Sequence, residues 1–175
     1  GRKAIEPERF YTIQMNHLDT AENLLKAFRL TSPIIREINH PEENAFLEKP
    51  IQIKVVSAEK YTKTIRVGTQ STTVIDLEKA RDFFERDGLR FSTFPEVLRL
   101  LREQGLSIGN SVIAAGSTIP VTTNSGQQHM IAPVVTSNPG GHTAGIVGTG
   151  IMGLLNPSNS FIAVTKENVS VQQDK

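Results

Sequence analysis

No Asp, Glu, Lys or Arg occurs between Glu103 and Lys166, a run of 62 uncharged residues in a chain of which 21% is charged. Charges scattered at the chain's own average would almost never leave such a gap, so a physical constraint must exclude charge from 104–165. Moving an unpaired charge out of water costs a large free energy. A region without charge can be covered completely, and we expect much of this one to be covered by protein.

The gap separates two regions of different composition. Of the 37 charged residues, 33 precede the gap and 4 follow it, and 10 of the 13 glycines lie inside it. The length fits one domain with a large appendage, or two small domains. We predict an α+β domain over residues 1–105, with a small antiparallel sheet and three to four short helices. Residues 106–175 are predicted to form a neutral β or extended region, either an arm or a small β module.

Local patterns in the first region predict both strands and helices. Thr93 and Glu96 have the spacing of a capping box with Pro in the first turn, and Asp76 can cap another helix. Asp87-Gly88 and Gly105 are expected to end these two helices. Two earlier helices are predicted to begin near Asp19 and near Ser32. The strands expected from alternation and β-branched content are Phe10–Met15, Ile51–Val56, Tyr61–Val67 and Thr72–Ile75.

Beyond Gly105 no helical period survives, and short apolar runs alternate with Gly, Asn and Pro. Such runs favour β-strands joined by wide turns. The expected strands are Ser111–Ala114, Ile119–Thr122, Met130–Thr136 and Phe161–Val164.

One motif suggests a nucleotide site but lacks the required context. Gly148 to Gly153 matches G-x-G-x-x-G. That motif binds a dinucleotide only when a helix follows it and an acidic residue comes about 20 residues later. Here Asn156-Pro157 would break the helix. We therefore predict no cofactor.

The residues that carry catalysis or bind metals form no constellation. His129 and His142 have no metal-ligand spacing with a carboxylate or another His, and Cys is absent. No G-x-S-x-G elbow occurs, and 104–165 offers no acid to orient a His. The prediction is a protein that is not an enzyme, with no catalytic, cofactor-binding or metal residues. An enzyme whose pocket forms between subunits stays open.

Charge and aromatic content bear on the class of partner. The formal net charge is +1, aromatics are 6% of the chain and Trp is absent. A specific nucleic-acid partner is therefore not predicted. Residues 144–155 are apolar and rich in Gly, but twelve residues are fewer than the ~20 that a spanning helix needs. Insertion of 144–155 into a membrane during entry or pore formation is the alternative to burial against protein.

The leading hypothesis is a non-enzymatic structural subunit of a large symmetric assembly. Its partners would be copies of itself and other assembly proteins, since interfaces deplete charge and strand addition relies on the backbone. The expected setting is a virion, which the Gly1 start would suit as a matured end, or a ring in a cell envelope. The segment Val112 to Thr122 resembles part of secretin-like envelope channels but covers too little of the chain to imply a fold. The predicted interface residues are Ile146, Val147, Ile151, Met152, Leu154 and Leu155.

Overall fold

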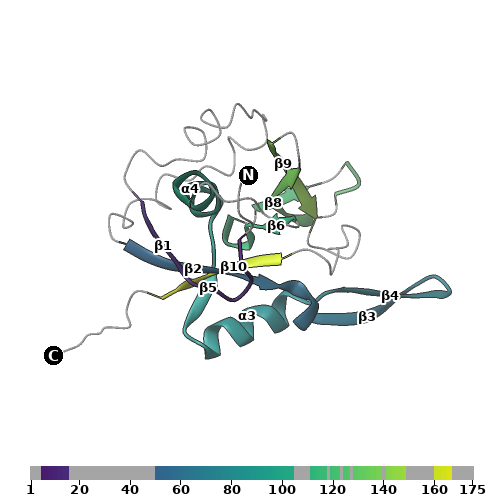
Figure 1. Ribbon diagram of the computed structural model, residues 1–175. Coiled ribbons are helices and arrows are strands. Elements are labelled where there is room, and N and C mark those ends of the chain that lie inside the picture. The colour runs from purple at the N-terminus through teal and green to yellow at the C-terminus, as the bar shows by residue number, and fades with distance from the viewer. Residues whose placement is uncertain are drawn as a thin grey trace.

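The structure is a computed structural model, and it describes residues 5–15, 50–104, 111–117, 119–122, 124–126, 128–138, 141–148 and 160–166 (Figure 1). The strands are β1 (Tyr11–Gln14), β2 (Pro50–Ser57), β3 (Thr62–Val67), β4 (Gln70–Ile75), β5 (Leu89–Phe91), β6 (Val112–Ile113), β7 (Ile119–Thr122), β8 (Gln128–Asn138), β9 (Gly141–Gly148) and β10 (Ser160–Thr165). The helices are α3 (Leu77–Arg86) and α4 (Phe94–Gln104), and two 3-10 turns are η2 (Ala58–Lys60) and η3 (Ala115–Ser117).

Eight of these strands form one mixed sheet. The order from one edge is β1, β2, β10, β6, β8 and β7, with β5 also paired to β10 and β9 to β8. The pairing of β10 with β6 is parallel, and the other pairings in this sheet are antiparallel. β10 therefore lies in the middle of the sheet, with β2 on one side and both β5 and β6 on the other.

This sheet shows that the predicted fold class was wrong. The sheet is not a small antiparallel one confined to residues 1–105, because β6 to β10 all belong to it. The described residues contain two α-helices instead of three to four. The helices predicted near Asp19 and Ser32 lie outside the described residues. Alternation within a strand indicates which of its faces is buried, but it does not indicate which strands pair with it. The sequence therefore did not predict the position of β10 in the sheet.

Both faces of β10 are covered, one by each helix. Ile162 and Val164 pack in a core cluster with residues of α4, such as Leu98. Phe161 and Ala163 pack in a second cluster with Phe84 of α3. Figure 1 shows α4 on one side of the central strands and α3 on the other. A strand buried on both faces tolerates no charge, so burial within the chain itself explains why β10 is uncharged.

An aromatic cluster fixes α3 and the start of β3 to the sheet. The ring centroids of Phe84 and Phe91 are 4.9 Å apart, and those of Phe91 and Phe161 are 5.2 Å apart. The Tyr61 ring lies edge-on to Phe84 at 5.8 Å. Burial raises the pKa of Tyr61. The cluster thus joins residues from four elements or their borders that are far apart in the sequence.

The predicted caps at the starts of α3 and α4 are confirmed, whereas the predicted end of α4 at Gly105 lies outside the described residues. The Thr93 N–H donates to Glu96 Oε1 at 2.8 Å, and the Glu96 N–H donates to Thr93 Oγ1 at 3.4 Å, which completes the capping box of α4. The Lys79 N–H donates to Asp76 Oδ1 at 3.1 Å at the start of α3. After α3, Gly88 has φ +72°, a left-handed conformation that favours glycine.

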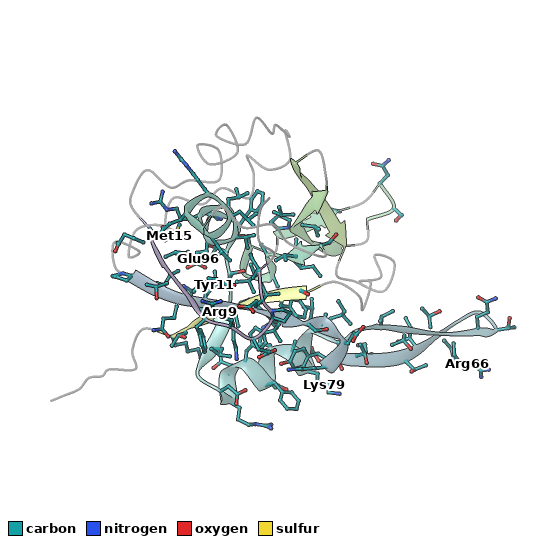
Figure 2. The ribbon with its side chains drawn as sticks, in the orientation of Figure 1. Arg9, Tyr11, Met15, Arg66, Lys79 and Glu96 are labelled. Atoms are coloured by element: carbon teal, nitrogen blue, oxygen red, sulfur yellow. The ribbon has the colours of Figure 1, made fainter. Side chains whose placement is uncertain are left out.

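The hairpin of β3 and β4 projects from the body of the molecule. The two strands pair over six positions, from Thr62↔Ile75 to Val67↔Gln70, and form a separate two-stranded sheet. At its root, the Asp76 N–H donates to the Tyr61 carbonyl at 2.7 Å. Figures 1 and 2 show the hairpin extending away from the main sheet, with Arg66 toward its tip. We call Thr62–Ile75 the arm.

Candidate assembly surface

The two outermost strands of the main sheet differ in how their free edges are protected. Natural proteins blunt edge strands by keeping them short, by placing charges or Pro on them, or by covering them. β1 has four residues, and the Gln14 N–H donates to the Glu103 carboxylate of α4 at 3.2 Å. This edge is therefore short and partly capped by a charged side chain.

β9 has none of these protections in its own sequence. It pairs with β8 over eight positions, from Gly141↔Asn138 to Gly148↔Ile131, and no other described strand pairs with it. Its sequence, GHTAGIVG, contains no charged residue and no Pro. In an antiparallel ladder alternate residues direct their N–H and C=O groups away from the partner strand. The outer edge of β9 is thus a row of backbone donors and acceptors that a further strand can pair with.

Two of the six predicted interface residues lie in this strand. Ile146 is opposite Pro133 and Val147 is opposite Ala132 in the β8–β9 ladder. These two consecutive residues therefore both lie in the outermost strand of the sheet. Ile151, Met152, Leu154 and Leu155 lie outside the described residues. Whether Ile146 and Val147 contact a neighbouring subunit stays a prediction.

The charge-free region has two parts with different surroundings. Val112, Ile113, Val135 and the middle of β10 have no exposed surface and belong to the chain's own core. Burial in that core does not explain why charge is absent from the exposed turn at 124–126 and from β9, whose outer edge has no described partner strand. Burial inside the chain therefore accounts for one part of the gap, and the edge of β9 is where a covering partner would account for another.

β9 was not predicted as a strand, although the sequence held a signal for it. Three glycines interrupt its apolar pattern, and residues 144–155, which overlap it, were interpreted as a segment buried against protein or inserted into a membrane. The predicted strand Met130–Thr136 is confirmed within β8, and Asn138-Pro139-Gly140-Gly141 follows it. A turn sequence after a strand, followed by a run of similar length, indicates a hairpin. β5 was also missed, because three residues are too few to show a period.

The histidines in this region do not come together. His129 lies opposite Val121, and His142 lies opposite Ser137. Ser137 lies eight positions along β8 from His129, which corresponds to about 26 Å at ~3.3 Å per residue. The backbone positions of His129 and His142 are therefore far apart within one chain. No group of three or more His, Asp or Glu within reach of one metal ion occurs among the described residues.

The N-terminus of α4 offers no anion site, because its donors are already used. The Thr93 N–H donates to Glu96, and the Phe94 N–H donates to Ser117 Oγ at 2.8 Å. Pro95 has no N–H, and the Glu96 N–H donates back to Thr93. A phosphate or carboxylate ligand would find no free donor in this turn.

One carboxylate on the surface is held by two lysines. The Glu8 oxygens lie 3.2 Å from Lys54 Nζ and 3.0 Å from Lys60 Nζ. Burial alone would raise the pKa of Glu8, but the hydrogen bonds and charges of the two lysines together lower it. Glu8 also has φ +66°, a strained conformation for a residue with a side chain. Its N–H donates to Val55 O at 2.8 Å, so this group fastens the N-terminal segment to β2.

Among the described residues, none of the helices has the length and apolar character needed to cross a membrane. Comparison of the chain with known protein families, with curated proteins and with solved structures gave no match.

Proposed function

We propose that the chain is a non-enzymatic structural subunit, and that copies of it assemble by adding strands to the edge of β9. The observation that carries the proposal is the contrast between the two ends of the sheet. The β1 edge is short and capped by Glu103, whereas β9 offers eight neutral residues with no described strand beside their outer edge. A long unprotected edge is a template for pairing with another chain.

The charge pattern supports the same proposal. Charge is depleted at the fully buried centre of protein interfaces. The exposed face of a strand inside the sheet carries polar residues such as Gln52 and the half-buried Lys54, whereas β9 has no Lys, Arg, Asp or Glu at any position. The expected setting is a virion shell or a ring in a cell envelope, since both are built from many copies of one chain.

Insertion of 144–155 into a membrane is the less favoured alternative. Ala144–Gly148 form backbone pairs with Ile131–Val135 of β8. Insertion would first have to break this part of the ladder, whereas strand addition at the outer edge keeps it intact.

The test is to place a charge on the β9 edge and measure the mass of the assembly. We expect size-exclusion chromatography with light scattering to give a defined oligomer for the unmodified chain. Thr143→Lys should lower the mass toward that of a monomer. The control is Gln52→Lys, which adds the same charge to an exposed position on β2, a strand with neighbours on both sides. Equal masses for both variants and the unmodified chain would contradict the proposal.

A further inference from the structure

Beyond its root, the arm, Thr62–Ile75, packs against little of the part of the chain that the structure describes. Val74 and Ile75 at its root are 5% and 6% exposed. Further out, Thr64, Arg66 and residues 68–71 at the tip are exposed. Figure 2 shows the side chains of the outer half of the arm standing clear of the main sheet. An isolated two-stranded hairpin is at best marginally stable in water, so a projecting one gains most from a partner.

The charges of the arm narrow the kinds of partner. Between Lys60 and Asp76 the only charged residues are Lys63 and Arg66. Both are exposed, and among the described residues neither makes an ion pair. The remaining exposed side chains of the arm are mainly the hydroxyls of Thr and Ser. The arm therefore carries two positive charges and no negative one.

Two charges are too few for the arm to hold a nucleic acid by itself. Each phosphate contact contributes about −0.9 to the slope of log affinity against log salt, so two contacts give a slope of about −2 and weak binding. No aromatic residue lies between Tyr61 and Ile75 to stack on a base. A backbone edge is the larger feature, since each strand of the arm pairs with a described strand on one side alone.

We propose that the arm pairs through one of its outer edges with the β9 edge of a second copy of the chain. This inference rests on the proposed function, because it names the partner of the same β9 edge. β3 and β4 each supply six residues and β9 supplies eight, so the lengths match. Pairing of two arms would bring Lys63 and Arg66 near like charges, which is destabilising. β9 has no charged residue, so it would repel neither Lys63 nor Arg66.

The geometry of this contact is head-to-tail. The arm and the β9 edge are different surfaces, so each copy contributes its arm to one neighbour and its β9 edge to another. Contacts of this kind close into rings or continue as filaments, depending on the rotation between copies.

Shortening the arm tests the inference. Replacing Ile65–Thr72 by Asn-Gly keeps the Thr64↔Thr73 pair and supplies a turn suited to a two-residue hairpin loop. We expect this variant to fold as the unmodified chain does and to lose its assembly in light scattering. The matched control is Lys63→Gln with Arg66→Gln, which removes the charges but keeps the edge. It should assemble at least as well as the unmodified chain.

The outcomes separate the inference from the proposed function. If the unmodified chain is a monomer at every concentration, the proposed function fails, and the inference with it. If the unmodified chain assembles and the shortened variant assembles equally, the inference alone is wrong. If the unmodified chain is retained on a DNA column and the double Gln variant loses both this retention and its assembly, the partner is a polyanion and the inference is also wrong.

Cross-linking gives a second measurement that does not depend on the shortened variant folding. The chain contains no Cys, so any introduced thiol is unique. Thr73→Cys and Thr143→Cys are made separately and treated with a flexible bismaleimide, alone and mixed in equal amounts. We expect dimers in the mixture and few in either variant alone. Dimers mainly in Thr143→Cys alone would indicate β9–β9 pairing, and absence of mixed dimers would overturn the inference.

Discussion

Arg90 and Glu96 form a two-point ion pair in which the carboxylate has no exposed surface. Arg90 Nη1 lies 2.9 Å from Glu96 Oε1, and Nη2 lies 2.7 Å from Oε2. Arg90 belongs to β5 and Glu96 to the first turn of α4, so the pair fixes the helix to the strand that precedes it. Figure 2 labels Glu96 beneath α4, close to the sheet.

We predict that Arg90→Met destabilises the protein by about 3–5 kcal/mol, because it leaves the buried Glu96 carboxylate without its cation. Urea unfolding measures the change. The double variant Arg90→Met with Glu96→Leu should recover part of the loss, since no charge then stays buried. Arg90→Met with the stability of the unmodified chain would show that the pair is not formed.

The charge-free region should tolerate an introduced charge only at positions that are exposed to solvent. Ala163 is fully buried in β10, and Asn124 is exposed in a turn of the same region. We predict that Ala163→Asp unfolds the protein or lowers its stability by several kcal/mol, whereas Asn124→Asp changes it by less than about 0.5 kcal/mol. Thermal unfolding of the two variants gives the comparison, and equal tolerance would mean that β10 is not in the core.

Replacing Gly116 even by Ala should destabilise the protein. A Cβ at this position would lie 2.5 Å from the backbone oxygen of Ser92, which also accepts the Gly116 N–H at 2.8 Å. Relieving the clash requires the backbone of two elements to separate. We predict a loss of about 1–3 kcal/mol in urea unfolding. The exposed substitution Ser71→Ala serves as the control, and a Gly116→Ala variant as stable as this control would refute the close approach.

The pKa of Glu8 predicts a pH dependence with a definite sign. Because the two lysines lower the pKa of Glu8 in the folded state, its contribution to stability is complete above the ordinary carboxyl pKa of about 4.3 and is lost as the pH falls through the lower, folded value. The side chain is 43% exposed, so the contribution is at most about 1 kcal/mol. Glu8→Gln should therefore cost stability at pH 6, and the cost should shrink steadily as the pH falls below about 4.3. Denaturation over a series of acidic pH values measures the trend, and a cost that does not change with pH would contradict the prediction.

Local features of the fold could be predicted because the residues that cause them are neighbours in the sequence. Asp76 and the Thr93–Glu96 box fix the starts of α3 and α4 through bonds that span three residues. The alternation of 51–56 likewise predicted β2. The place of β10 could not be predicted, because its partners β2, β5 and β6 lie far away along the chain.

The candidate surface overlaps the predicted interface residues at two positions. Ile146 and Val147 lie in β9, whose outer edge has no described partner strand, and their contact with a neighbouring subunit stays a prediction. Composition alone does not tell whether charge is absent because of the chain's own core or because of a partner. Both would remove water from the residues that they cover, and so both would exclude charge. The two strands of the arm were predicted, but the projection of the arm from the main sheet depends on where that sheet ends, which no local sequence pattern indicates.

The central claim is that the outer edge of β9 becomes paired when copies assemble, and hydrogen exchange tests it most directly. Amides of β9 that point away from β8 should exchange at least about ten times more slowly in concentrated than in dilute solution. The Gln14 amide, which donates to Glu103, serves as an internal reference with unchanged exchange. Exchange of the β9 amides that does not depend on concentration, in a chain whose mass does, would contradict the account.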